Sequence, residues 1–65
     1  MDLKGEIEAI ETEAQEAGLA MRRFCQMADI AETTWMRWKN DLTAPNSRTW
    51  QRVEKARVEM KRGAA

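Results

Sequence analysis

The segment that decides the fold spans residues 21–40 and reads MRRFCQMADIAETTWMRWKN. Within it, Trp35 and Trp38 stand three residues apart among polar and charged neighbours. Residues at this spacing share one side of an α-helix, which we predict over about residues 32–40. We expect the two indoles to be buried and to anchor that helix. The opposite side then presents Thr33, Met36, Arg37 and Asn40.

A shorter helix is predicted before the tryptophans, from Met21 to about Ala28. Its residues at inward-facing spacing are Phe24, Cys25 and Ala28. Ala20 is a poor N-cap because it has no side-chain oxygen to accept a hydrogen bond from a free amide. Asp29, Ile30 and Ala31 then read as a short turn. Glu32 or Thr33 is expected to cap the helix that follows this turn.

The chain after the tryptophans is predicted to form a loop over residues 41–45, because Pro45 disfavours helical geometry at the residue before it. Asn46 or Ser47 is expected to cap a last helix that runs to about Arg62. Four of its residues recur at helical spacing and are expected to face inward: Trp50, Val53, Arg57 (through its methylene groups) and Met60. Five basic residues of this helix are expected to be solvated or to help form a subunit contact: Arg52, Lys55, Arg57, Lys61 and Arg62.

The first part of the chain, residues 1–17, is predicted to form an acidic amphipathic helix that ends at Gly18. Its apolar positions recur every three or four residues: Leu3, Ile7, Ile10, Ala14 and Ala17. No segment shows the alternation of a strand. The whole chain, 1–65, is therefore predicted to be one all-α domain of four helices. Its parts are the acidic first helix (1–17), the central helix pair (21–40), the last helix (46–62) and a frayed tail (63–65).

Composition excludes several classes of protein. The 65 residues include no His and a single Cys, so the sequence predicts neither an internal disulfide nor a structural zinc site. No apolar run approaches the roughly 20 residues that cross a membrane, and we expect a cytoplasmic protein of a bacterial cell. No nucleophile–base pair or glycine-rich phosphate loop is present. We therefore predict no enzymatic activity and no cofactor.

The charged residues are distributed unevenly although the formal net charge is zero. Residues 1–21 contain one Lys and six acidic residues, a net charge of −5, whereas residues 22–65 contain ten basic and five acidic residues, a net charge of +5. The later part is therefore suited to contact a polyanion, with the first helix held away from it.

Residues 21–40 resemble the helix-turn-helix motif of the lambda-repressor and Cro family of phage regulators. In that family the fifth residue is small, the ninth is a turn glycine, and the fourth, tenth, fifteenth and eighteenth are apolar. Here these positions hold Phe24, Cys25, Asp29, Ile30, Trp35 and Trp38. Cys25 fits because two helices cross closely there. Asp29 replaces the glycine at a position that often takes positive φ, which Asp tolerates better than most residues.

The resemblance, which covers about residues 15–56, implies a lambda-repressor-like fold with residues 32–40 as a recognition helix in the major groove of DNA. The residues it places against base edges are Glu32, Thr33, Met36 and Arg37. Arg37 is suited to a bidentate contact with guanine, and Glu32 to accept from a cytosine amino group. Each also has a plainer role, because Glu32 favours a helix N-terminus and Arg37 can hold a phosphate.

The resemblance also implies contacts with the DNA backbone. The residues at the corresponding positions are Arg22, Arg23, Lys39, Asn40, Asn46, Ser47 and Arg48. Proteins of this type generally bind pseudo-palindromic operators as dimers. We therefore expect a homodimeric, sequence-specific transcriptional regulator of phage or prophage type, similar to Cro or a repressor, that acts by occupying an operator; whether it activates or represses is left open.

A second hypothesis is that the fold serves as a protein-binding module with little specific DNA binding. A zero net charge and a sequence pI of about 6.2 are unlike the usual footprint of a DNA-binding domain. The partner would be RNA polymerase, another regulator or a host defence complex. Under this hypothesis Trp35 or Trp50 would be exposed at the centre of the interface.

Overall fold

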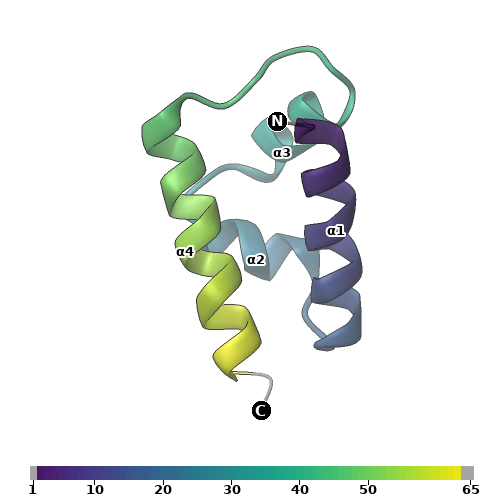
Figure 1. Cartoon of the computed structure of the whole chain (residues 1–65), viewed down its shortest axis with the longest axis vertical. Coiled ribbons are helices and arrows are strands. Elements are labelled where there is room, and N and C mark those ends of the chain that lie inside the picture. Colours follow the sequence, from purple (N-terminus) through teal and green to yellow (C-terminus); the bar gives the residue numbers. More distant parts are fainter. Residues whose placement is uncertain (1, 64–65) are drawn as a thin grey trace.

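The computed structural model describes residues 2–63, which form four helices and no strand (Figure 1). The helices are α1 (Leu3–Glu16), α2 (Met21–Met27), α3 (Glu32–Lys39) and α4 (Ser47–Gly63). The all-α prediction is thus confirmed for the described part of the chain. Of the tail expected over residues 63–65, Gly63 instead ends α4, and residues 64–65 lie outside the described range.

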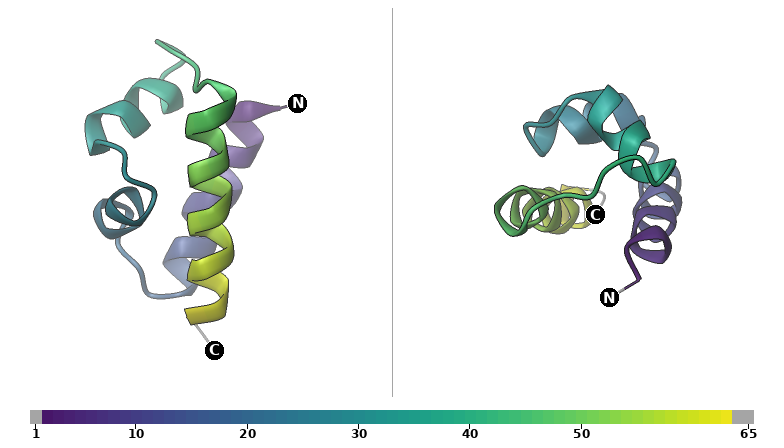
Figure 2. Two further views of the ribbon diagram at one scale, coloured as in Figure 1. Left: turned by 90° about the vertical axis from the view of Figure 1, so that its left-hand side faces the viewer. Right: turned by 90° about the horizontal axis from the view of Figure 1, so that it is seen from above.

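The helices are arranged as a long pair with a short pair beside it. α1 and α4 extend along the longest axis of the molecule and begin at the same end (Figure 1). Seen from above, α2 and α3 lie on one side of the α1–α4 pair (Figure 2). The end of the molecule that carries α3 is therefore opposite to the end that carries the last turn of α4 (Figure 1).

The core forms where these four helices meet, and aromatic rings dominate it. The Phe24 and Trp35 rings meet edge to face at 5.8 Å, the Trp35 and Trp38 rings lie 5.8 Å apart, and the Trp38 and Trp50 rings 6.3 Å apart. Trp35 and Trp38 are only 1% and 3% exposed, which confirms that they anchor α3. The buried core residues are Ile7, Ile10, Ala14, Phe24, Cys25, Ala28, Trp35, Trp38, Val53, Ala56 and Met60.

Three helices, α1, α2 and α3, end in the same way: the residue one position after the C-cap has a left-handed backbone conformation, with positive φ. Gly18 after α1, Asp29 after α2 and Asp41 after α3 have φ of 71°, 58° and 59°. At each end, the amides of this residue and of the next bond back to carbonyls of the last turn, as Asp29 does to Gln26 and Ile30 to Cys25. The expected positive φ at Asp29 is confirmed. The matching role of Asp41 was not predicted.

Side-chain caps stabilise the starts of the two long helices. Asp2 Oδ1 accepts from the Gly5 amide at 3.2 Å, and Asn46 Oδ1 accepts from the Thr49 amide at 2.8 Å, so Asn46 rather than Ser47 caps α4. The prediction for α3 was wrong: neither Glu32 nor Thr33 caps it. Its N-cap is Ala31, which makes no side-chain hydrogen bond, because the helix already includes Glu32 as its first residue. α2 likewise starts from Ala20 without a side-chain cap, as expected.

An ion-pair cluster joins the two long helices, and we call it the α1–α4 seam (Glu6, Glu13, Arg57 and Lys61). Arg57 donates from Nε and Nη2 to the two oxygens of Glu13 at 2.8 and 2.6 Å, and from Nη1 to Glu6 at 2.9 Å. Lys61 adds a pair with Glu13 at 3.4 Å. The expectation that Arg57 is solvated was wrong, because α1 supplies a carboxylate pair that its guanidinium fork fits and its side chain is only 18% exposed.

Candidate nucleic-acid interface

The exposed side of α3 carries all four residues that the sequence predicted to meet bases. Glu32, Thr33, Met36 and Arg37 are all exposed, with Met36 at 47%. Their spacing of one, three and four residues places them on the side opposite Trp35, which is buried. The burial of one side of α3 therefore fixes which side chains its other side presents.

The turn between α2 and α3 determines how this exposed side is held. Ile30 is partly buried against the core, and its amide bonds to the Cys25 carbonyl at 3.0 Å. Cys25 is 1% exposed and belongs to the buried core. Burial, together with the nearby charge of Glu32, raises the pKa of the Cys25 thiol to about 11. Cys25 is thus a neutral packing residue at neutral pH, not a reactive thiolate.

The residues predicted to meet phosphates all lie on the surface, but on three different elements. Two lie on α2, two at the end of α3, and three at the start of α4: Arg22, Arg23, Lys39, Asn40, Asn46, Ser47 and Arg48. Some already have partners within the chain, since Arg23 Nη1 donates to Gln26 Oε1 at 3.3 Å and the side-chain oxygen Oδ1 of Asn46 caps α4. Among residues 2–63, Arg22, Arg37 and Arg48 have no ion-pair partner.

The acidic residue Glu11 contacts α3 directly, which sequence reasoning did not predict. Its Oε2 accepts a hydrogen bond from Trp35 Nε1 at 3.2 Å and lies 3.1 Å from Lys39 Nζ. A separation of at least 24 residues gives no local pattern from which this contact could have been found. Lys39, one of the residues predicted to contact a DNA phosphate, is therefore already paired with a carboxylate of the chain itself.

The α1–α4 seam neutralises acidic residues of α1. The hydrogen bond from Arg57 is the main cause that holds the pKa of Glu13 below its ordinary value, and the same bond raises the pKa of Arg57. The acidic first helix is therefore only partly a free anionic surface: Glu6, Glu11 and Glu13 have cationic partners, whereas Glu8 and Glu16 are exposed and have none among the described residues.

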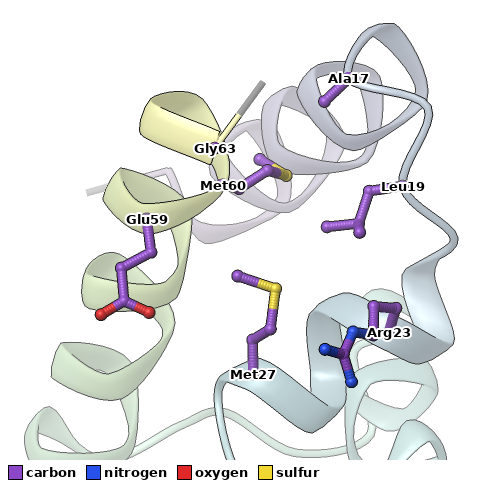
Figure 3. Close-up of a pocket in the computed structure, with 7 residues that line it drawn as sticks. All are labelled: Ala17, Leu19, Arg23, Met27, Glu59, Met60 and Gly63. Carbon is purple, nitrogen blue, oxygen red and sulfur yellow. The ribbon is translucent and has the colours of Figure 1, made fainter. Parts of the chain in front are cut away.

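An open cleft of about 260 Å³ lies at the other end of the molecule, where α1, α2 and α4 meet (Figure 3). Its lining is mostly apolar, with Leu19, Met27 and Met60 around it and the charged Arg23 and Glu59 on α2 and α4 (Figure 3). None of these lining residues is a Ser, Thr, Cys or His that could form a nucleophile–base pair. It also contains none of the residues predicted to meet bases.

The described residues add two further findings. Among residues 2–63, no group of three or more His, Cys, Asp or Glu side chains is placed to hold a metal ion. Over the same range, every helix is too short or too polar to cross a bilayer. Comparison of the chain with protein-family models, with curated proteins and with solved structures gave no match.

Proposed function

We propose that this chain binds double-stranded DNA in a sequence-specific manner and acts as a transcriptional regulator of the lambda-repressor and Cro type. In this proposal α2, the turn at Asp29 and α3 form a helix-turn-helix, and α3 enters the major groove. The observation that carries it is the two-sided construction of α3. Trp35 and Trp38 are buried to 3% exposure or less, whereas Glu32, Thr33, Met36 and Arg37 are all exposed.

Each exposed residue of α3 has a chemistry that suits a base edge. Arg37 has no ion-pair partner among the described residues, so its guanidinium fork is available for the two acceptors of a guanine. Glu32 accepts from a cytosine amino group. Met36 and Thr33 offer apolar contact to a thymine methyl. Arg22 on α2 and Arg48 on α4 supply positive charge for phosphates on either side of α3.

The remaining features of the proposal concern the assembly. A single chain of this size reads only a few base pairs, so two copies would bind a pseudo-palindromic operator with half-sites about one helical turn apart. Occupation of such an operator represses transcription by excluding other proteins from the site. The regulator would belong to a phage or prophage and act in the bacterial cytoplasm.

The protein-binding alternative rests on the zero net charge of the chain and on its exposed apolar residues. Met36, Leu42 and Val58 are 47%, 71% and 54% exposed. They lie on α3, on the loop after it and on α4. The expectation that Trp35 would be an exposed anchor of such an interface was wrong, because it is 1% exposed and belongs to the core. Trp50, the other residue named for that interface, is partly buried and packs against the core, so neither indole is a fully exposed anchor.

The test is selection of bound duplexes from a randomised library, followed by fluorescence anisotropy on the selected sequence and a scrambled one. We expect the chain to prefer the selected duplex, with affinity that falls as salt rises. Arg37→Ala should cost about 1–3 kcal/mol on the selected duplex and relax the preference at one base pair.

The matched control is Arg62→Ala, which also removes one positive charge but from the last turn of α4, at the end away from α3 (Figure 1). It should weaken binding to both duplexes equally and only slightly. If selection yields no enriched sequence, and Arg37→Ala behaves as Arg62→Ala does, the protein-binding alternative replaces this proposal.

A further inference from the structure

One carboxylate oxygen of α1 holds two side chains of α3. Glu11 Oε2 accepts from Trp35 Nε1 at 3.2 Å and pairs with Lys39 Nζ at 3.1 Å. Trp35 and Lys39 are four residues apart, so they lie one turn from each other on the same side of the helix. Glu11 therefore contacts α3 at two points: a neutral one at Trp35, in the middle of the helix, and a charged one at Lys39, its last residue.

The two contacts differ in how firmly they are held. Trp35 is 1% exposed, and its indole N–H would lose its only hydrogen-bond acceptor among the described residues without Glu11. The side chain of Lys39 is 44% exposed and that of Glu11 24% exposed, so water and a phosphate can reach the ammonium group. The Trp35 contact thus fixes the position of the carboxylate, and the fixed carboxylate attracts Lys39.

We propose that Glu11 is a positioning residue that orients α3 through Trp35 and holds Lys39 away from a nucleic-acid phosphate. The inference rests on the proposed function for its biological meaning, since Lys39 is one of the residues expected to meet the DNA backbone. It adds to the proposed function a residue that limits the positive charge available to DNA. The free charge on the DNA-facing side is set by an acidic residue of α1, a helix that does not itself meet the DNA.

Salt dependence is the measurement that tests this inference. The binding constant falls as salt rises, and each phosphate neutralised by a side chain adds about 0.9 to the steepness of log K against log salt. This steepness, taken as a positive number, is called the slope below. The probe is a short DNA duplex of random sequence, so that no operator has to be known. Binding is followed by fluorescence anisotropy between about 50 and 200 mM salt. The proteins are the native chain, Glu11→Gln, Glu8→Gln, Lys39→Gln and the double variant Glu11→Gln/Lys39→Gln.

Glu8→Gln is the matched control because Glu8 is an exposed acidic residue of the same helix, and its carboxylate has no partner among the described residues. It removes the same charge without touching Lys39. We expect Glu11→Gln to raise the slope by about 0.9 and the affinity at about 0.1 M salt roughly eightfold over Glu8→Gln. Its amide oxygen still accepts from Trp35, so α3 keeps its position.

The Lys39 variants complete the cycle. In the native chain Lys39→Gln should leave the slope unchanged, whereas in the Glu11→Gln background it should remove the added 0.9 or so. A native chain whose slope drops by about 0.9 on Lys39→Gln would overturn the inference, because Lys39 would then already meet a phosphate. This comparison also holds if Glu11→Gln fails to fold, which circular dichroism of each variant reveals.

The outcomes separate this inference from the proposed function. Specificity is measured by the selection from a randomised library, and the role of Glu11 by the salt slopes. A selection without an enriched sequence, together with a steeper slope for Glu11→Gln than for Glu8→Gln, supports the role of Glu11 and contradicts the specific regulator. An enriched sequence together with equal slopes for these two variants does the reverse. Absence of duplex binding by all five proteins at the lowest salt contradicts both.

Discussion

The α1–α4 seam and the exposed surface of α2 and α3 differ in how many of their charged residues are paired. At the α1–α4 seam, Arg57 makes three hydrogen bonds to two carboxylates, and its side chain is only 18% exposed. On the α2–α3 side, Arg22 and Arg37 are exposed and have no ion-pair partner among residues 2–63. The uneven charge of the sequence therefore serves partly to hold the fold. Only the charges left unpaired are available to a partner.

The largest effect is expected from removing the anchor of α3. Trp35→Ala deletes a side chain that is 1% exposed and packs against Phe24 and Trp38, and should lower the free energy of unfolding by about 3–5 kcal/mol. A loss of this size approaches the whole stability of a small domain. Urea unfolding followed by circular dichroism measures it. Met36→Ala, on the exposed side of the same helix, should change stability by no more than about 0.5 kcal/mol. Equal effects would contradict the two-sided description of α3.

A smaller effect is expected at the α1–α4 seam. Arg57→Met leaves Glu13 without its main partner, and should lower the free energy of unfolding by about 1–2 kcal/mol because charge-assisted hydrogen bonds are lost. Arg62→Met is the control, since Arg62 lies on the same helix but is exposed and unpaired among the described residues. If both variants unfold at the same urea concentration, the seam contributes nothing beyond a surface charge.

The seam also predicts a dependence of stability on pH. The pKa of Glu13 is lowered in the folded chain, so its contribution is present above its ordinary value of 4.5 and is lost as the pH falls through the folded pKa. The native chain should therefore lose more stability than Arg57→Met between about pH 6 and pH 3. Urea midpoints at these two pH values measure the difference. Parallel losses in the two proteins would mean that Arg57 does not shift the titration.

The smallest effect is expected at the turn that sets α2 against α3. Asp29 has φ of 58°, a conformation that glycine adopts without steric cost. Asp29→Gly should raise the free energy of unfolding by about 0.5 kcal/mol, and Asp29→Ala should lower it by about 1 kcal/mol. The pair with Arg52 matters little, because its atoms are 3.9 Å apart and both side chains are exposed. A stabilising Asp29→Ala would show that the left-handed backbone is not retained in solution.

Much of the fold was determined by local features of the sequence. The apolar spacing in residues 1–17, the paired tryptophans and the position of Pro45 predicted the four helices, with boundaries that the structure moves by only one or two residues. These predictions succeed because residues three or four apart share one side of a helix. The buried side therefore appears in the sequence as apolar residues at that spacing. The same spacing of apolar residues identified which side of α3 is exposed.

Only the tertiary structure decided the partners of the charged residues. Glu11 meets Trp35 and Lys39, and Arg57 meets Glu6 and Glu13, across separations of 24 to 51 residues. Nothing local distinguishes these side chains from solvated ones, because an ion pair depends on which helices are packed together. The sequence thus set the helices and their buried faces by itself. The packing of α1 against α3 and α4 then determined which charges are neutralised and which remain free on the proposed DNA-binding surface.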